Sequence, residues 1–175
     1  MSHDHDDQDP ACDMAHGTLA APATGRRLVV VFASPVGREL ADLSARAGWD
    51  VVLLDPQHPE QALPGVVHAT NATHAGLHDD TDVVVCDHDR PELGDVLAEV
   101  LQHPTRWVGV MGSPRHTAPH VAALQERGTP QADVDRVHRP IGLDIGSRSP
   151  IEIAISTVAG LLADRNGRAG GPYTG

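Results

Sequence analysis

The stretch LVVVFASPVGRELADLSARAGWDVVLL, residues 28–54, decides the fold of this chain. Residues 28–33 form an apolar, β-branched run, which is typical of strands buried on both faces. Apolar residues then recur at helical spacing over residues 36–47, and Gly48 ends that segment. Residues 50–54 repeat the first pattern. The order strand, helix, strand predicts a parallel βαβ unit.

The same alternation continues along the chain. We expect further strands at 66–69, 81–86 and 106–111, and helices at 91–101, at 114–127 and from Pro150 onward. Ser149 and Glu152 have the spacing of a capping box at the start of the last helix. The sequence therefore predicts one α/β domain over residues 26–166, a doubly wound, Rossmann-like, mostly parallel sheet flanked by helices.

Composition excludes several classes of function. The 175 residues carry 24 acidic and 13 basic side chains, and the formal charge of −11 argues against nucleic acid as a partner. Every basic residue is Arg, so a Schiff-base lysine and a Walker A loop are excluded. No apolar stretch reaches the ~18–20 residues of a membrane span. Two cysteines without CxxC spacing favour a reducing, cytoplasmic compartment.

The two ends of the chain differ from the rest. Residues 1–25 are rich in Asp and His and poor in apolar side chains, so we expect a disordered acidic tail. Residues 167–175 are expected to be disordered as well. His3, His5, Cys12 and His16 leave weak capture of a metal ion open as an alternative to a plain solvated tail.

Polar and glycine-rich residues gather where the predicted strands end, and in a doubly wound sheet these carboxyl ends border the ligand. Phe32, Ser34 and Gly37 occupy the three glycine positions of a dinucleotide fingerprint. Asp55 ends the second strand, where such folds place a ribose-binding acid, although Asp-Pro is also an ordinary turn. The loss of two glycines weakens the case for NAD(P).

The residues after the strand at 81–86 allow three interpretations. His88 is a general base oriented by a neighbouring carboxylate, or Asp87, His88 and Asp89 all contribute to a metal site, or the segment is an exposed polar turn. In the third interpretation Asp89 and Glu92 form a capping box for the next helix.

Two further loops complete the candidate site. Gly112, Ser113 and Arg115 surround a predicted helix N-terminus, and such a terminus can bind an anion. The alternative is an ordinary helix start at which Ser113 serves only as the N-cap. In the loop 142–148 we expect buried Leu143 and Ile145, with Asp144 held outward or paired with Arg148. The candidate cofactor-binding residues are Ser34, Gly37, Asp55, Asp87, His88, Gly112, Ser113, Arg115, Asp144 and Gly146.

Several segments resemble the XdhC/CoxI family, accessory proteins of molybdenum hydroxylases such as xanthine dehydrogenase and carbon monoxide dehydrogenase. The matching stretches are TDVVVCDHDR (81–90), WVGVMGSPR (107–115) and, most specifically, VHRPIGLDIGSRSPIEIAIS (137–156). The resemblance covers roughly residues 28–165 and concerns the family's C-terminal, Rossmann-type domain.

The resemblance implies a maturation factor that binds the molybdenum cofactor and helps insert it into an apo molybdenum hydroxylase, without turning over a substrate. On that view Gly112–Arg115 receives a phosphate of the pterin or of a nucleotide. The family's glycine-rich first loop is Ala33-Ser34-Pro35 here. We expect that a separate chain supplies the family's N-terminal domain or that this protein has a reduced role. An NAD(P)-linked oxidoreductase and a nucleotide-binding regulatory module are the alternatives, and homodimerisation stays open.

Overall fold

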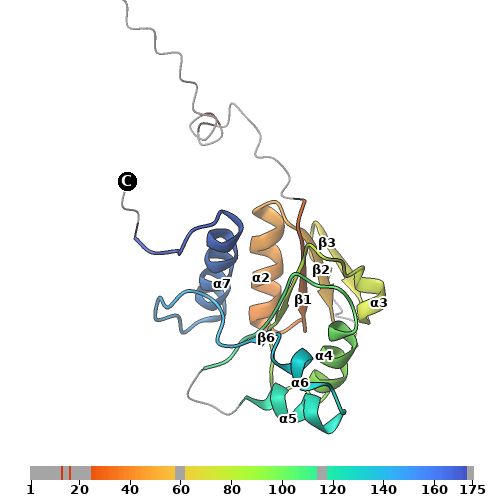
Figure 1. Ribbon diagram of the computed structural model, residues 1–175. Coiled ribbons are helices and arrows are strands. Elements are labelled where there is room, and N and C mark those ends of the chain that lie inside the picture. The colour runs from red at the N-terminus through yellow and green to blue at the C-terminus, as the bar shows by residue number, and fades with distance from the viewer. Residues whose placement is uncertain (1–12, 14–15, 17–24, 58–61, 114–117, 173–175) are drawn as a thin grey trace, which may run out of the picture.

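The computed structural model describes residues 13, 16, 25–57, 62–113 and 118–172. A central parallel sheet lies between two layers of helices (Figure 1). The strands are β1 (Arg27–Val31), β2 (Asp50–Leu54), β3 (Val66–Ala69), β4 (Thr81–Val85), β5 (Trp107–Val110) and β6 (Val137–His138). The helices are α2 (Pro35–Arg46), α3 (Ala72–Ala75), α4 (Leu93–Leu101), α5 (Pro119–Glu126), α6 (Gln131–Val134) and α7 (Pro150–Arg165).

The strand order is β3-β2-β1-β4-β5-β6, and every neighbouring pair is parallel. This is the doubly wound Rossmann order, so the predicted fold class is confirmed. The chain proceeds outward from β1 to β2 and β3, then crosses back to place β4 on the other side of β1. Loops from β1 and β4 therefore diverge at the carboxyl edge, and a crevice opens there in such folds.

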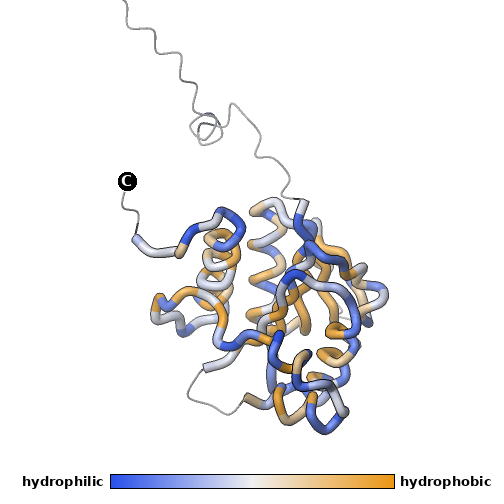
Figure 2. The backbone as a smooth tube through the Cα atoms, in the orientation of Figure 1, coloured by the Kyte–Doolittle hydropathy of each residue, from blue (hydrophilic) through white to orange (hydrophobic). Residues whose placement is uncertain are grey.

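Alternate side chains of each strand enter two separate cores. Val29 and Val31 pack with α3, α4 and α5, whereas Leu28 and Val30 pack with α2 and α7. All four side chains are fully buried, because both faces of a parallel sheet are covered. In Figure 2 the most apolar parts of the tube accordingly follow the strands.

Several element boundaries match the sequence prediction. Strands β2 and β3 span the predicted residues, and α7 begins at Pro150. Its capping box is confirmed, since Ser149 Oγ accepts from the Glu152 amide at 3.4 Å and Glu152 Oε2 accepts from the Ser149 amide at 3.0 Å. Among the described residues, no helix is both long and apolar enough to cross a membrane.

Other predicted boundaries are wrong. Helix α4 begins at Leu93 rather than at residue 91, because residues 91–92 form a turn that the Leu93 amide closes on the Arg90 carbonyl. Helix α5 begins at Pro119 rather than at residue 114, with Ala118 at its N-cap. A residue that precedes proline is disfavoured in the α conformation, so Pro119 defines the start of this helix. Residues 114–117 lie outside the described part of the chain.

Candidate functional site

The turn after β1 retains the geometry of a dinucleotide loop although two of its glycines are replaced. Phe32, at the first glycine position, has φ +72°, a conformation that bulky residues rarely adopt. At the third position, a Cβ on Gly37 would overlap the Phe32 carbonyl oxygen. Ser34, at the second position, caps α2 by accepting from the Gly37 amide at 3.2 Å and donates to the Cys86 carbonyl at 3.4 Å. The chain therefore keeps the tight strand-to-helix turn that the glycines usually provide.

The Asp55 carboxylate is buried at the end of β2 and already has four polar contacts. It accepts from the backbone amides of Ala33 and Gln57, each at 2.9 Å. Arg90 contributes the other two contacts, with Nη2 at 3.2 Å from Oδ1 and Nη1 at 3.4 Å from Oδ2. A carboxylate has about four acceptor directions, so Asp55 has no acceptor direction left for a ribose hydroxyl.

Arg90, which the sequence analysis did not single out, links the two strand ends that flank the crevice. Its guanidinium lies 4.8 Å from the centre of the Phe32 ring and bridges Asp55 to Glu92. Hydrogen bonds from Arg90 and from the Gln57 side chain lower the pKa of Glu92 to about 2. An arginine in the loop that follows a predicted strand is a signal that was available from the sequence.

Asp87 and His88 lie where predicted, at the carboxyl end of β4. Asp87 Oδ1 accepts from the Asp89 amide at 3.0 Å, and His88 Nε2 lies 3.8 Å from Asp89 Oδ1. The predicted Asp89–Glu92 capping box is wrong, because Glu92 itself is the N-cap of α4 and makes no side-chain cap. Within the described ranges no three His, Cys, Asp or Glu side chains are grouped so that they could hold a metal ion.

The ends of β5 and β6 bring together groups from three segments. The Arg139 guanidinium lies against Gly112, which has φ +154°, and its Nη2 donates to the Ser113 carbonyl at 3.0 Å. His120, in the first turn of α5, is 3% exposed, and its Nδ1 has no hydrogen-bond partner. Burial, together with the nearby charges of Arg139 and His88, lowers the pKa of His120. We name Arg139, His88 and His120 the edge cluster.

The edge cluster differs from the predicted anion site at Gly112–Arg115. Ser113 does not cap α5, which begins at Pro119, and Arg115 lies outside the described residues. The sequence analysis singled out neither His120 nor Arg139, and Arg139 was missed because the two-residue strand β6 before it was not predicted.

The loop 142–148 is held to α7 through its first half. The Ser156 hydroxyl donates to the Leu143 carbonyl at 2.7 Å, and the Leu143 amide donates to the Ser156 carbonyl at 3.2 Å. Asp144 and Gly146 are exposed, and no Asp144–Arg148 ion pair occurs among these described side chains. Ile145 is 54% exposed, so the prediction that it is buried is wrong.

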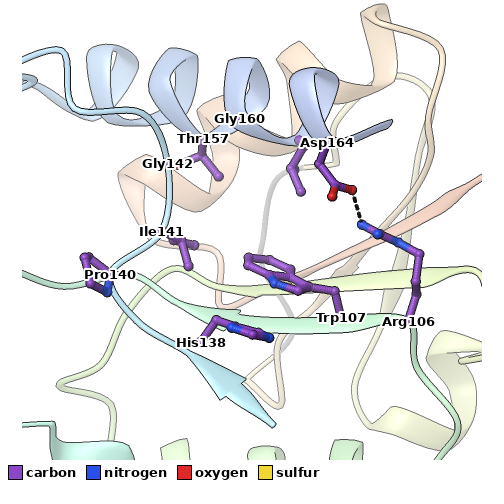
Figure 3. A pocket seen from close by; sticks show the side chains of 10 residues that line it. Arg106, Trp107, His138, Pro140, Ile141, Gly142, Thr157, Gly160 and Asp164 are labelled. Carbon is purple, nitrogen blue, oxygen red and sulfur yellow. Dashed lines mark ion pairs between the residues drawn. The ribbon is translucent and has the colours of Figure 1, made fainter. Parts of the chain in front are cut away.

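A pocket of about 310 Å³ lies between the strands β5 and β6 and helix α7 (Figure 3). We name it the α7 pocket. Its lining comprises Arg106, Trp107, His138, Pro140, Ile141, Gly142, Thr157, Gly160, Leu161 and Asp164. Helix α7 packs mainly on α2, and it forms one wall of the pocket together with the loop that follows β6. Sequence analysis did not predict this pocket.

Comparison with known proteins agrees with the fold and with the sequence resemblance. Residues 28–161 match the family model described as the XdhC Rossmann domain. An uncharacterized Escherichia coli K12 protein, YqeB, is 29% identical over 155 residues, which are 83% of this chain and 28% of YqeB.

A crystal structure from Bacillus halodurans, described as a xanthine dehydrogenase, is 25% identical with a TM-score of 0.62. That match covers 79% of this chain and 43% of the other, so the chain spans less than half the length of either relative. Because the family model covers most of the chain, the protein belongs to the XdhC family, and the part that matches is the family's Rossmann domain.

Proposed function

We propose that this protein is an accessory factor that binds the molybdenum cofactor and assists its insertion into a molybdenum hydroxylase. The observation that carries the proposal is the XdhC Rossmann match over residues 28–161. It is supported by the similarity to a B. halodurans protein described as a xanthine dehydrogenase. Both point to a role beside an enzyme of that class.

The edge cluster suits an anionic ligand of this kind. The molybdenum cofactor carries a phosphate, and Arg139 offers a guanidinium that matches phosphate geometry. The partnerless Nδ1 of buried His120 is a polar atom that a bound oxyanion would satisfy. His88, from the neighbouring strand end, lies near enough to help lower the pKa of His120. An anion-binding group is notable in a chain with a net charge of −11.

The crevice at β1 and β2 argues against NAD(P) as the ligand. The Asp55 carboxylate is engaged by two amides and by Arg90, so a ribose would have to displace a buried ion pair. Ser34 also adds a side chain where a pyrophosphate would approach the backbone. The proposal therefore places the ligand's anionic group at the edge cluster rather than beside Asp55.

The experiment mixes the full chain with molybdenum cofactor released from a purified molybdenum hydroxylase. Gel filtration, followed by fluorescence of the oxidised pterin in the protein fraction, measures binding. Activation of the apo-hydroxylase measures transfer. We expect Arg139→Ala to weaken binding roughly tenfold or more, because a hydrogen bond to a charged group is lost. Arg46→Ala is the control, since it removes an equal charge at the far end of α2.

Binding of NADH or NADPH together with failure to retain the cofactor would refute the proposal. Equal loss of binding in Arg139→Ala and Arg46→Ala would also refute the placement at the edge cluster, because it would reflect overall charge alone.

A further inference from the structure

The α7 pocket has an aromatic floor. The Trp107 indole lies over Gly109, where an added Cβ would collide with the ring, so this glycine makes room for it. The His138 ring stacks beside it, with centroids 5.6 Å apart and an interplanar angle of 12°. In Figure 3 the indole lies between His138 and helix α7, with one face toward the helix. Such a surface favours a flat aromatic ligand.

The rim of the pocket offers both donors and acceptors. Arg106 Nη2 contacts the Asp164 carboxylate at 2.8 Å and the buried Asp82 carboxylate at 2.6 Å. Asp164 is about half exposed, and its Oδ2 is the atom that Arg106 contacts. The Thr157 hydroxyl donates to the Ile153 carbonyl at 2.9 Å, so its lone pairs can accept from a ligand.

The charges at the rim cancel. Arg26 lies 3.5 Å from Asp164, so two arginines face two carboxylates and no net positive charge attracts a phosphate. The volume of about 310 Å³ is at the lower end of ligand pockets, which range over about 300–1,000 Å³. Charge and size together select a small, uncharged ring system rather than a dinucleotide or a phosphate ester.

Five of the ten lining residues come from two of the stretches that carry the family resemblance. Residues 107–115 contribute Trp107, and residues 137–156 contribute His138 and the segment 140–142. Gly142 lies close against α7, since an added Cβ would collide with the Ser156 hydroxyl. These stretches therefore build a shaped cavity as well as the strand ends of the edge cluster.

We propose that the α7 pocket is a second binding site, for an uncharged purine-sized nitrogen heterocycle stacked on Trp107 with its polar edge at Asp164 and Thr157. Asp164 and Thr157 accept from ring N–H groups, and Arg106 donates to a ring carbonyl or nitrogen. The site is separate from the edge cluster and does not depend on the proposed cofactor role.

The test uses tryptophan fluorescence, because the chain has two tryptophans. Trp49→Phe leaves Trp107 as the reporter, and it removes an indole N–H that has no hydrogen-bond partner, so the variant should fold. We expect guanosine, adenosine or both to quench this variant saturably. Trp107→Leu, which retains Trp49, should show no quenching and should bind roughly 5- to 150-fold more weakly by calorimetry.

A second pair of variants separates the carboxylate from overall charge. Asp164→Asn should weaken guanosine binding roughly tenfold, because the N1–H and 2-amino donors of guanine lose a charged acceptor. Asp42→Asn, a partly exposed carboxylate on α2, is the matched control and should bind like the wild type. Replacing guanosine with its 5′-monophosphate should bring no gain in affinity.

Three results would overturn the proposal. The first is the absence of saturable quenching by either nucleoside up to its solubility limit. The second is unchanged affinity in both Trp107→Leu and Asp164→Asn. The third is loss of nucleoside binding in Arg139→Ala, which would place the ligand at the edge cluster. Asp164 is half exposed, so Asp164→Asn keeps the test decisive if Trp107→Leu does not fold.

Discussion

Replacing Gly37 by alanine tests the close approach that positions α2 against β1. The new Cβ would lie less than 3.0 Å from the Phe32 carbonyl oxygen, closer than real Cβ atoms come to other atoms. The backbone fixes the position of the Cβ, and the oxygen that it meets belongs to the main chain, so no side chain can rotate to relieve the contact. Helix α2 would have to move, although it packs on α7 and buries Leu40 completely. Overpacking costs about 1–3 kcal/mol of stability. Because this collision involves the main chain, we expect Gly37→Ala to lower the unfolding free energy by about 3 kcal/mol.

Gly160→Ala is the matched control in α7. Its Cβ would meet the nearest atom, Gly142 Cα, at 3.5 Å, which is an ordinary van der Waals contact. Alanine is favoured over glycine in a helix interior by about 0.8–1.0 kcal/mol, so this variant should be slightly more stable than the wild type. The same substitution is therefore expected to lower the unfolding free energy at position 37 and to raise it at position 160.

Urea unfolding followed by circular dichroism measures both variants. We expect the unfolding midpoint to fall for Gly37→Ala and to rise for Gly160→Ala, with similar m-values. If the unfolding free energy of Gly37→Ala lay within about 0.5 kcal/mol of the wild type, the inferred contact between β1 and α2 would be wrong.

Asp55→Asn should lower the unfolding free energy by about 3 kcal/mol, the low end for breaking a buried ion pair, because Arg90 retains its ion pair with Glu92. Calorimetry and urea unfolding measure this loss, and a loss under about 1 kcal/mol would contradict the structure. The lowered pKa of His120 means that below pH ~6.5 the unfolded chain binds a proton that the folded chain does not. The free energy of unfolding should therefore decrease as the pH is lowered. His120→Leu should flatten that dependence in urea midpoints measured from pH 7.5 to 5, and an unchanged slope would exclude His120 as its source. Ser149→Ala should cost about 1 kcal/mol through loss of the α7 cap, and a thermal midpoint equal to the wild type would contradict the capping box.

Elements with strong local signals were predictable from the sequence. Strand β2 follows from an unbroken apolar run, and α7 begins where Ser149 and Glu152 can cap each other within four residues. The short strand β6 was not predictable, because two residues carry no periodicity and pair only where β5 is already in place. The start of α5 was misplaced because two prolines, at positions 114 and 119, offer competing helix starts.

The location of the candidate site was predictable from the sequence, but the residues that form it were less so. Strand ends marked the carboxyl edge, and Asp55, Asp87 and His88 do lie there. What each side chain does depends on partners far along the chain: Arg90 reaches Asp55 across 35 residues.

The sequence by itself therefore determined the fold class, the alternation of strands and helices, and the edge at which polar residues gather. Those features arise from periodicity and capping, which act within a few residues. Only the tertiary structure decided that Arg90 occupies the acceptors of Asp55, that Phe32 takes a glycine-like conformation, and that a pocket lies under α7. Such features depend on which distant groups share a small buried volume, because burial makes an unpaired charge or a void costly.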